Sequence, residues 1–328
     1  MGSESNGVAI VGAGIIGGSI AWRLAQAGVR VTVFDAGLAG GEASSAGAGM
    51  LSPGGEFDRP SVWFELGIES MRMYPAFVEE LQAETGVAID FQICGCKQLV
   101  EAEQARPRAD FQARAGVCVE LTSDGLYYPL DGFVNPNDVL RALRRACEDR
   151  NVKIAEGQPV TEIESADYRA VVIAAGAWST QVTVRHDRKC VTLPEVKPIK
   201  GHLIGFQLRP GSLGPMLRQG HSYVLQRSNG FTITGSTEED VGFDRAVSPT
   251  ICQALHHDAA GLFLAIADAT PCARWIGFRP FSPQGPHISR VDGTNVWLAY
   301  GHFRNGILLA PVTAQRIADG IISYVAIS

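Results

Sequence analysis

A glycine-rich run near the start of the chain has the spacing of a phosphate-binding turn. Gly12, Gly14 and Gly17 form the pattern G-x-G-x-x-G, and the next apolar run ends at an acidic residue, Asp35. In such a turn the first glycine permits a tight bend, the second lets a pyrophosphate approach the backbone, and the third lets a helix pack close to a strand. An acid at the position of Asp35 can accept hydrogen bonds from the ribose of an adenosine. These residue types at this spacing indicate a dinucleotide-binding site.

The segments around the glycines predict the elements that such a site requires. Residues 8–11 are all apolar, which is typical of a short buried parallel strand. Apolar residues then recur at every fourth position from Ile16, which predicts a helix, and Gly28 stands where a helix C-terminal glycine belongs. Residues 29–34 are predicted to form a second strand. Because glycine-rich turns are common, the order strand, turn, helix and strand is what favours the dinucleotide interpretation.

Composition and charge exclude several classes of protein. The 328 residues are enough for a sizeable core and for more than one typical domain, and 46% hydrophobic with 19% charged residues describe an ordinary soluble globular chain. A net charge of −6 argues against a nucleic-acid partner, which requires a basic face. Residues 1–7 lack the basic region of a secretory signal, and residues 8–22 are too short to span a bilayer. Seven cysteines, an odd number, do not suggest a disulfide framework, so we expect a cytoplasmic protein with no membrane partner.

Later apolar patterns predict that the dinucleotide-binding fold is interrupted and then resumed. Residues 59–86 and 135–150 have the periodicity of amphipathic helices, and residues 171–176 form another buried-strand run that ends in glycine. Such a strand brings its carboxyl end to the ligand-binding edge of a parallel sheet. A last strand is expected at residues 296–300, and a closing helix at residues 307–325.

The region between these segments has the signals of an antiparallel sheet. Short strand-like segments occupy residues 197–275, and the Ser-Asn-Gly sequence at residues 228–230 is a favourable hairpin turn. Residues 250–267 are predicted to be helical. Residues 40–53 are mostly small and polar, but Met50 lies inside this run and favours a buried, ordered loop over a flexible linker.

Cysteine and histidine residues do not reach the number that a metal centre needs. Cys94 and Cys96 form a close pair, but the chain has no second pair to complete a zinc site. Cys252 and His256 lie one helical turn apart and lack a third ligand nearby. We therefore expect no metal site and assign both pairs to the core or to a helix face.

Four motifs together resemble a single family of enzymes. Besides the glycine-rich turn, they are residues 44–51 (Ser-Ser-Ala-Gly-Ala-Gly-Met-Leu), residues 277–280 (Gly-Phe-Arg-Pro) and residues 301–311 (Gly-His-Phe-Arg-Asn-Gly-Ile-Leu-Leu-Ala-Pro). They resemble the cofactor loop, the substrate-carboxylate motif and the closing motif of the D-amino-acid oxidase superfamily of FAD enzymes. Within it the chain looks most like glycine oxidase of thiamine biosynthesis. The sequence His-Ser-Tyr at residues 221–223 also resembles the strand that carries a tyrosine over the flavin.

The resemblance implies an α/β fold with two domains. A Rossmann-type FAD-binding domain would be interrupted by an inserted substrate domain built on an antiparallel sheet. The expected FAD-binding domain is residues 1–88, 132–190 and 285–328, and the expected substrate domain is residues 89–131 and 191–284.

Two features depart from the pattern of the family. Residues 91–176 form a shorter stretch than the family norm, so part of the insertion and a strand excursion after Val160 are expected to be missing. Tyr300 stands where a small residue is usual, close to the expected flavin. Both departures concern the shape of the substrate pocket, and the resemblance leaves a homo-oligomer open.

The resemblance also implies the residues of the site. Arg279 would hold a substrate carboxylate through its planar guanidinium fork, Tyr223 would close the pocket, and Arg304 would stabilise negative charge on the reduced flavin. FAD would be bound non-covalently, because Cys272, the cysteine nearest the closing motif, precedes the substrate arginine. The expected FAD contacts are Gly12, Gly14, Ile15, Ile16, Gly17, Asp35, Ala36, Ala43, Ser44, Ala48, Gly49, Met50, Val160, Gly176, Gly301, His302, Phe303, Asn305, Gly306, Ile307 and Leu308.

On the residues alone, each of these assignments has an ordinary alternative. Arg279 precedes a proline and is compatible with a surface arginine in a turn, whereas Tyr223 on a short strand is compatible with a core residue. His302 and Asn305 are compatible with a loop in which side chains satisfy backbone groups.

The reaction that the resemblance implies is FAD-dependent oxidative deamination. Glycine, sarcosine or a small D-amino acid would become an imine and then a keto acid, molecular oxygen would become hydrogen peroxide, and the product would supply thiamine thiazole synthesis. Three alternatives stay open: an FAD-dependent amino-acid dehydrogenase of the same fold with an acceptor other than oxygen, an NAD-linked Rossmann enzyme, and a non-catalytic flavin-binding scaffold. The interrupted domain argues against the NAD enzyme, and Arg279 argues against the scaffold.

Overall fold

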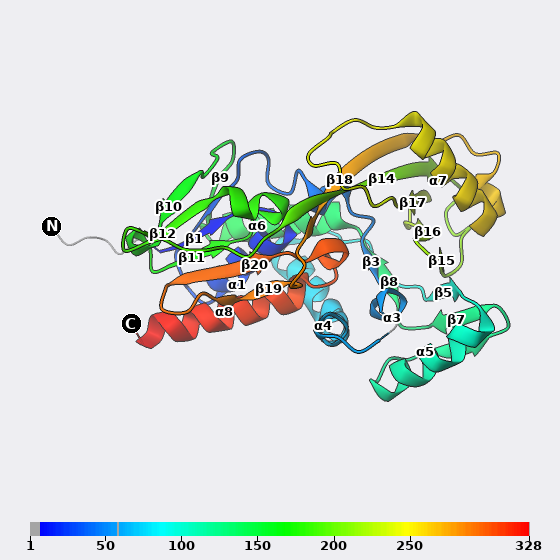
Figure 1. The fold of residues 1–328 in the computed structure, drawn as a ribbon, viewed down its shortest axis with the longest axis horizontal. Helices are drawn as coiled ribbons and strands as arrows, with labels where there is room; N and C mark the ends of the chain where they lie inside the picture. Colours follow the sequence, from blue (N-terminus) through cyan, green and yellow to red (C-terminus); the bar gives the residue numbers. More distant parts are fainter. Residues whose placement is uncertain (1–6, 58, 328) are drawn as a thin grey trace.

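The computed structural model describes residues 7–57 and 59–327, which form two lobes around two separate sheets (Figure 1). Residues 1–6, on which the expectation about a secretory signal partly rests, lie outside the described residues. Within residues 7–57 and 59–327, no helix is long and apolar enough to cross a membrane. In the same described part of the chain, no three side chains of the metal-ligating types come together.

The first lobe is built on a six-stranded, mainly parallel sheet. In order across the sheet, its strands are β19 (His287–Arg290), β20 (Val296–Tyr300), β11 (Ala170–Ile173), β1 (Val8–Val11), β2 (Val31–Phe34) and β9 (Lys153–Ala155). Neighbours from β20 to β9 pair in parallel, and β19 pairs antiparallel with β20. The interrupted Rossmann-type fold is confirmed, because β1 and β2 are adjacent to strands that come from distant parts of the sequence.

The central strand of this sheet is buried on both faces. Val8 and Ile10 of β1 pack in the same cluster as helix α1 (Ile15–Gln26), whereas Ala9 and Val11 belong to a cluster on the opposite face. Successive side chains of a strand point to opposite faces, so a strand covered on both sides must be apolar throughout. This requirement explains the uninterrupted apolar run that the sequence shows here.

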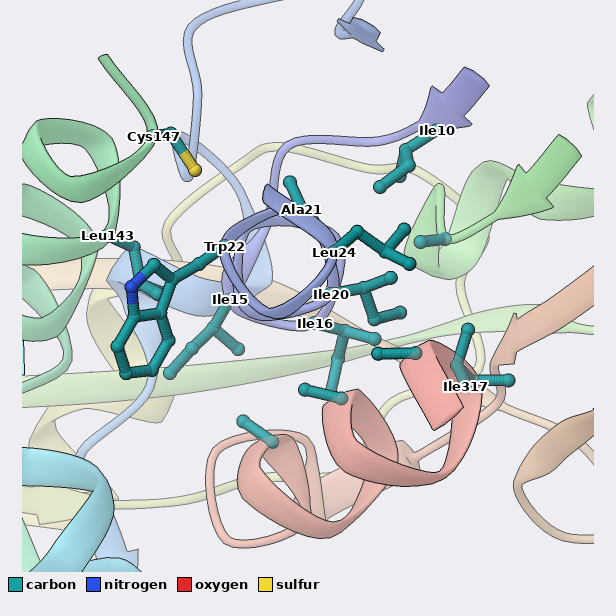
Figure 2. Close-up of a cluster of buried hydrophobic side chains, with 14 of the residues drawn as sticks. Ile10, Ile15, Ile16, Ile20, Ala21, Trp22, Leu24, Leu143, Cys147 and Ile317 are labelled. Atoms are coloured by element: carbon teal, nitrogen blue, oxygen red, sulfur yellow. The ribbon is translucent and has the colours of Figure 1, made fainter. Parts of the chain in front are cut away.

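Helix α1 is packed between other helices of the first lobe (Figure 2). Ile16 and Ile20 of α1 belong to the same buried cluster as Leu143 of α6 and Ile317 of α8. Complete burial of each isoleucine stabilises the fold by roughly 2 kcal/mol. The helices of this lobe are α1, α2 (Ala43–Ala46), α3 (Pro53–Glu56), α4 (Val62–Thr85), α6 (Pro136–Asp149) and α8 (Ala310–Ile327).

Two three-stranded sheets accompany the six-stranded sheet. Val184 of the first small sheet packs in one cluster with Val171 and Leu298 of the six-stranded sheet. The second small sheet contains Met50 and thereby orders the small, polar segment at residues 40–53. In order across each sheet, the strands are β10 (Glu162–Glu164), β12 (Thr183–His186) and β13 (Lys189–Cys190), and β3 (Met50–Leu51), β8 (Gly132–Val134) and β4 (Phe91–Ile93).

The second lobe is built on a mainly antiparallel eight-stranded sheet, as the sequence predicts. In order across the sheet, its strands are β18 (Ala273–Phe281), β14 (Lys197–Gln207), β17 (Phe231–Gly235), β16 (Ser222–Gln226), β15 (Met216–Gln219), β5 (Cys96–Leu99), β7 (Gly125–Tyr128) and β6 (Glu120–Thr122). Only β15 and β5 pair in parallel among these neighbours. Helix α7 (Pro249–Leu262) covers one face, where Leu255 packs with Phe206 and Val224.

Several boundaries differ from the predictions. The helix expected over residues 250–267 ends at Leu262, and a short 3-10 helix, η3 (Leu264–Ile266), follows it. The closing helix begins at Ala310, three residues later than expected, because residues 306–309 form a turn that follows the 3-10 helix at residues 303–305. Helix α5 (Ala102–Arg114) was not predicted, since its buried positions are small or polar and give no apolar stripe.

Candidate cofactor and substrate site

The glycine-rich turn between β1 and α1 is too crowded for side chains. Gly12 has a φ of +107°, and a Cβ added there would lie 2.4 Å from the carbonyl oxygen of Ala174. A Cβ added to Gly17 would lie 1.9 Å from the carbonyl oxygen of Gly12. Both positions therefore require glycine, which brings the start of α1 against the carboxyl ends of β1 and β11.

The N-terminus of α1 has the properties of a phosphate site. Gly14 is the N-cap residue and supplies no side-chain hydrogen bond. Ser44, from helix α2, accepts a hydrogen bond from the backbone N–H of Ile15 through its Oγ at 2.9 Å. First-turn N–H groups and the positive end of the helix dipole favour an anion at this position. Ala43 precedes Ser44 in the same short helix and is half-buried.

Asp35 lies at the carboxyl end of β2, beside the turn. Its Oδ2 accepts a hydrogen bond from the N–H of Ala13 at 2.8 Å, and its Oδ1 accepts one from Gly37 at 2.9 Å. The N–H of Gln158 donates to the carbonyl oxygen of Asp35 at 2.9 Å, which brings the segment that ends at Val160 to the same edge. A crowded glycine turn, a helix N-terminus and a carboxylate in this arrangement fit the adenosine diphosphate part of FAD.

Four further predicted contacts lie at the start of α1, after β2 and after β11. Ile15 and Ile16 are buried in the core below the turn, whereas Ala36 is exposed next to Asp35. Gly176 follows β11 and begins the 3-10 helix η2 (Gly176–Gln181) with a φ of +55°.

The segment 40–53, predicted to be a buried, ordered loop, is ordered by contacts with Arg227 of the second lobe and with β8. Arg227 donates from Nη2 to the carbonyl oxygen of Ala48. Its Nη1 donates to the carbonyl oxygen of Val134 at 2.7 Å. Burial lowers the pKa of Arg227 to about 10, so the guanidinium is still charged at neutral pH. A Cβ added to Gly49 would lie 1.9 Å from the carbonyl oxygen of Val134. Met50 then pairs with Phe133 in the small sheet.

The closing motif forms a tight turn before α8. Gly301 has a φ of +81°, and Phe303 begins the 3-10 helix η4 (Phe303–Asn305). His302 is fully buried with its Nε2 3.0 Å from the Oγ1 of Thr313, and burial lowers its pKa to about 3, so the ring is neutral at physiological pH. The N–H of Asn305 donates to the carbonyl oxygen of His302 at 2.9 Å. This bond joins two backbone groups, and the imidazole of His302 meets a side chain, so neither contact is the side-chain-to-backbone bond of the ordinary alternative.

The residues that complete the motif are held from the first lobe. Tyr74 of α4 donates from its hydroxyl to the carbonyl oxygen of Ile307 at 2.6 Å. Leu308 is buried in the main core of the first lobe, and Gly306 ends the 3-10 turn. A Cβ added to Gly47 would lie 2.5 Å from a side-chain carbon of Ile307, so the closing motif and the ordered loop touch.

Arg279 lies near the end of β18 and is held over the sheet. Its Nη1 donates to the carbonyl oxygen of Thr237 at 2.8 Å, and its Nη2 donates to the Oγ of Ser236 at 2.6 Å. Burial, followed by the nearby charge of Arg304, lowers the pKa of Arg279. The alternative of a surface arginine in a turn is therefore excluded by its position.

Tyr223 and Arg279 approach each other across two intervening strands. Each side chain lies over a glycine: a Cβ added to Gly201 of β14 would lie 2.3 Å from the Nη2 of Arg279, and one added to Gly235 of β17 would lie 3.2 Å from the hydroxyl of Tyr223. Burial raises the pKa of Tyr223 although Arg279 and Arg304 oppose this shift, so the hydroxyl keeps its proton and can donate it in a hydrogen bond.

Arg304 joins this group through two carboxylates that the sequence did not predict as site residues. Its Nη1 lies 2.5 Å from an oxygen of Glu238, and its Nε lies 3.5 Å from an oxygen of Glu56. Glu56 also pairs with Arg218 at 2.8 Å. Burial favours the neutral form of Glu56, but Arg218 and Arg304 outweigh burial and lower the pKa of this carboxyl.

A cavity of about 850 Å³ opens beside these charges. Arg304, Glu56, Arg218 and His221 line one part of it, and residues of β5 and α5 such as Arg108 line another part. The cavity is large enough for a small amino acid, and Arg304 lines it, whereas Arg279 and Tyr223 are not among its lining residues. The charges of Arg279 and Arg304 both act on Tyr223, which brings the three predicted catalytic residues into one group, and Glu56 and Glu238 are the additional charged groups of the site.

The buried Asp131 carboxyl gives a testable pH dependence. Asp131 is buried and accepts a hydrogen bond from the hydroxyl of Ser52, and burial raises its pKa from 3.8 to about 7. The unfolded chain loses this proton near pH 4 while the folded protein retains it, so stability falls as the pH rises from about 4 to about 7. Asp131→Asn should therefore stabilise the protein at pH 8 by about 3 kcal/mol more than at pH 5. Urea unfolding of both proteins at the two pH values measures the difference.

Asp124→Asn is a matched control for this prediction. Asp124 is exposed, and its Oδ2 lies 2.7 Å from the Nζ of Lys97. The hydrogen bond with Lys97 lowers the pKa of Asp124. The control should show no gain in stability between pH 5 and pH 8, because its carboxylate is ionised throughout this range in both states. Parallel pH profiles for the wild type and Asp131→Asn would contradict a buried, protonated carboxyl.

Comparison with known proteins agrees with this geometry. The family model described as FAD dependent oxidoreductase matches residues 7–320. The chain is 31% identical to the glycine oxidase of Geobacillus kaustophilus (strain HTA426) over 95% of this chain and 92% of that protein. It is 32% identical to the bifunctional protein ThiO/ThiG of Synechocystis sp. (strain ATCC 27184 / PCC 6803 / Kazusa), over 96% of this chain and 51% of that protein.

A solved structure extends the agreement to three dimensions. The crystal structure of glycine oxidase from Geobacillus kaustophilus superposes with a TM-score of 0.88 at 30% identity, and the match covers 96% of this chain and 94% of that chain. The family match spans nearly the whole chain, including the glycine-rich turn and the closing motif. The chain therefore belongs to the FAD dependent oxidoreductase family.

Proposed function

We propose that the protein oxidises glycine, sarcosine or a small D-amino acid to the imine, which water converts to the keto acid with release of ammonia (methylamine from sarcosine), and that molecular oxygen takes up the two electrons and two protons to become hydrogen peroxide. The observation that carries this proposal is the meeting of Arg279, Tyr223 and Arg304 beside the ordered loop and the closing motif. Similarity to glycine oxidases over nearly the whole chain supports the substrate class.

FAD would be held non-covalently by two groups of predicted contacts, one for each half of the cofactor. Gly12, Gly14 and Gly17 with Ser44 would hold the pyrophosphate, and Asp35 would bind the ribose. The ordered loop and the closing motif would hold the flavin ring. The bound FAD supplies the acceptor for a hydride and the route of its electrons to oxygen.

The protein side chains would bind and orient the substrate. Each terminal nitrogen of Arg279 has two N–H groups, and one on each already bonds to Thr237 or Ser236. The other two can form a parallel pair with a carboxylate. The hydroxyl of Tyr223 would donate a further hydrogen bond to the substrate. Such anchoring fixes the Cα–H bond, so loss of hydride from a neutral amine needs no general base.

Arg304 would supply positive charge at the same end of the site. Its guanidinium pairs with Glu56 and Glu238, so it is held in place before any ligand arrives. A fixed positive charge stabilises negative charge that develops during reduction without reorganising at the moment of reaction.

The decisive experiment measures peroxide and flavin reduction separately. Purified holoenzyme is mixed with glycine, sarcosine or D-alanine in air, and peroxide release is recorded. The same amino acids are then added without oxygen, and the flavin absorbance is followed. Bleaching with rapid reoxidation by air supports an oxidase, bleaching with slow reoxidation supports the dehydrogenase alternative, and no bleaching by any of the three excludes the proposed substrate class.

Three wider assignments belong to the same proposal. The division into a FAD-binding domain and a substrate domain at the expected boundaries is supported by the two main sheets, whose strands fall on opposite sides of those boundaries. Supply of thiamine thiazole synthesis is supported by similarity to the ThiO/ThiG protein. A cytoplasmic location is supported by seven cysteines that are all free thiols.

A further inference from the structure

Four consecutive residues after β17 connect both site arginines to the interior of the second lobe. We call residues 236–239 the clamp segment. Ser236 and Thr237 accept the two hydrogen bonds of Arg279, and Glu238 pairs with Arg304. One short segment therefore sets the positions of both guanidinium groups.

A buried histidine of the neighbouring strand β14 holds the clamp segment in place. His202 of β14 is fully buried, and its Nδ1 lies 2.7 Å from an oxygen of Glu239. Its backbone N–H donates to the Oγ1 of Thr237 at 2.9 Å. The backbone of Lys200 adds two hydrogen bonds with Glu239, each at 2.9 Å. The last two residues of the segment are thus held to one strand.

The hydrogen-bond partners of His202 assign its proton. The backbone N–H of Ser248 donates to Nε2 at 2.9 Å, so this nitrogen is an acceptor and carries no proton. The proton must then be on Nδ1, where it is donated to the carboxylate of Glu239. One imidazole therefore joins the clamp segment to the start of α7 in a single orientation.

Holding this segment matters because the two site arginines repel each other. The charge of Arg304 lowers the pKa of Arg279, which shows that the two guanidinium groups interact. A segment free to move would let them separate and would lose the spacing of the substrate fork. Glu238 neutralises part of the repulsion only while the segment stays in place.

We propose that His202 is a positioning residue, which acts through Glu239 and Thr237 to fix the clamp segment and hence the substrate arginine, Arg279. The expected change in KM rests on the proposed function, whereas the expected changes in hydrogen exchange do not. His202 does not touch the substrate in this scheme, so its loss should change substrate binding more than the chemical step.

The test compares three substitutions in the holoenzyme. His202→Leu removes both side-chain hydrogen bonds and should raise KM for the amino acid, and Kd for acetate measured from flavin absorbance, about tenfold while kcat changes less than threefold. His202→Asn can place an amide N–H near the Nδ1 position and should recover most of the loss. Glu239→Ala breaks the same bond from a partly exposed position and should reproduce the effect even if His202→Leu fails to fold.

Hydrogen exchange supplies a readout that does not depend on the reaction. Backbone amides of residues 236–248 should exchange faster in His202→Leu and Glu239→Ala, but not in His202→Asn. Thr232→Val is the matched control, because Thr232 is equally buried in the adjacent strand and bonds to Gln226 and Gly230 instead.

The outcomes separate the two proposals. Faster exchange with unchanged KM and acetate affinity would overturn the positioning role and leave His202 purely structural, and unchanged exchange would overturn the anchor itself. If the wild type reduces no flavin with any small amino acid, the proposed function fails, whereas the exchange and acetate measurements still decide the role of His202. An equal effect of Thr232→Val would also overturn the proposal.

Discussion

Arg279→Ala should lower kcat/KM for the amino-acid substrate by about 30-fold to several thousandfold. A carboxylate that enters the site loses hydration, and a paired guanidinium must replace the lost water. Removing one partner of such a buried pair costs about 2 to 5 kcal/mol, which corresponds to this range of rates. Arg279→Lys should restore only part of the activity, because a lysine supplies charge without the two parallel N–H groups. Steady-state kinetics with glycine measure both changes.

The matched control for this prediction is on the same strand. Arg274→Ala removes an exposed arginine of β18 and should leave kcat/KM unchanged. In Arg279→Ala the FAD content and Tm should stay close to the wild type, since the guanidinium donates its hydrogen bonds to the clamp segment and not to the core of either lobe, within the described part of the chain. Competitive inhibition by glycolate should weaken in parallel with kcat/KM. A variant that binds glycolate as the wild type does, or that unfolds, would assign Arg279 to structure.

The dinucleotide turn could be predicted from sequence because its determinants are local. Gly17 is required by the carbonyl oxygen of Gly12 in the same turn, and the glycine spacing between two apolar runs lies within one short stretch, whereas the atoms that crowd Gly12 belong to Ala174 and Ala175, far away in sequence. The uninterrupted apolar run of β1 likewise indicates that both faces of this strand are buried. Such features need no knowledge of the remainder of the fold.

The arrangement of the substrate site could not be predicted in the same way. Tyr223 and Arg279 meet only because Gly201 and Gly235 lie beneath them on two intervening strands, and nothing in the periodicity of those strands distinguishes these glycines. Their alignment depends on the register of the antiparallel sheet. The roles of Tyr223 and Arg279 were therefore implied by resemblance rather than by spacing.

The carboxylates that hold Arg304 were missed for a different reason. Glu238 belongs to an acidic run after a strand, which is typical of a solvated loop, and Glu56 follows a Pro-Gly-Gly sequence without periodicity. Glu56 is fixed by the helix that was not predicted: Gln112 of α5 donates to the carbonyl oxygens of Gly54 and Phe57, both at 2.7 Å. A buried glutamine at this position gave no apolar signal, so both the helix and the residue it positions escaped the prediction.

The three glycines of the turn are predicted to differ when substituted. A side chain at Gly12 or Gly17 collides with backbone atoms and should disrupt the fold of the first lobe itself. Gly14 has a φ of −69°, which any residue can adopt, and an added Cβ would lie 3.0 Å from the Oγ of Ser44, a side-chain atom that can move. Gly14 is thus the position at which binding of FAD can be separated from folding.

Gly14→Val should accordingly give a folded protein that has lost FAD. The branched side chain would project from the N-cap of α1 into the space that the pyrophosphate requires, and a clash that costs about 3 kcal/mol weakens binding about a hundredfold. The ratio of flavin to protein absorbance measures the loss, and circular dichroism should show native helix content.

Gly18→Ala is the matched control for this substitution, because Gly18 lies on the same helix, α1, and an added Cβ there meets Leu143 of α6 at an ordinary 3.6 Å. It should retain yellow protein from which heat or acid releases FAD into solution, as expected for non-covalent binding. If Gly14→Val keeps its FAD while Gly18→Ala behaves like the wild type, the pyrophosphate does not approach the backbone at Gly14. The glycine-rich turn would then be a structural feature of the α1 junction, and the cofactor would have to bind at the closing motif without it.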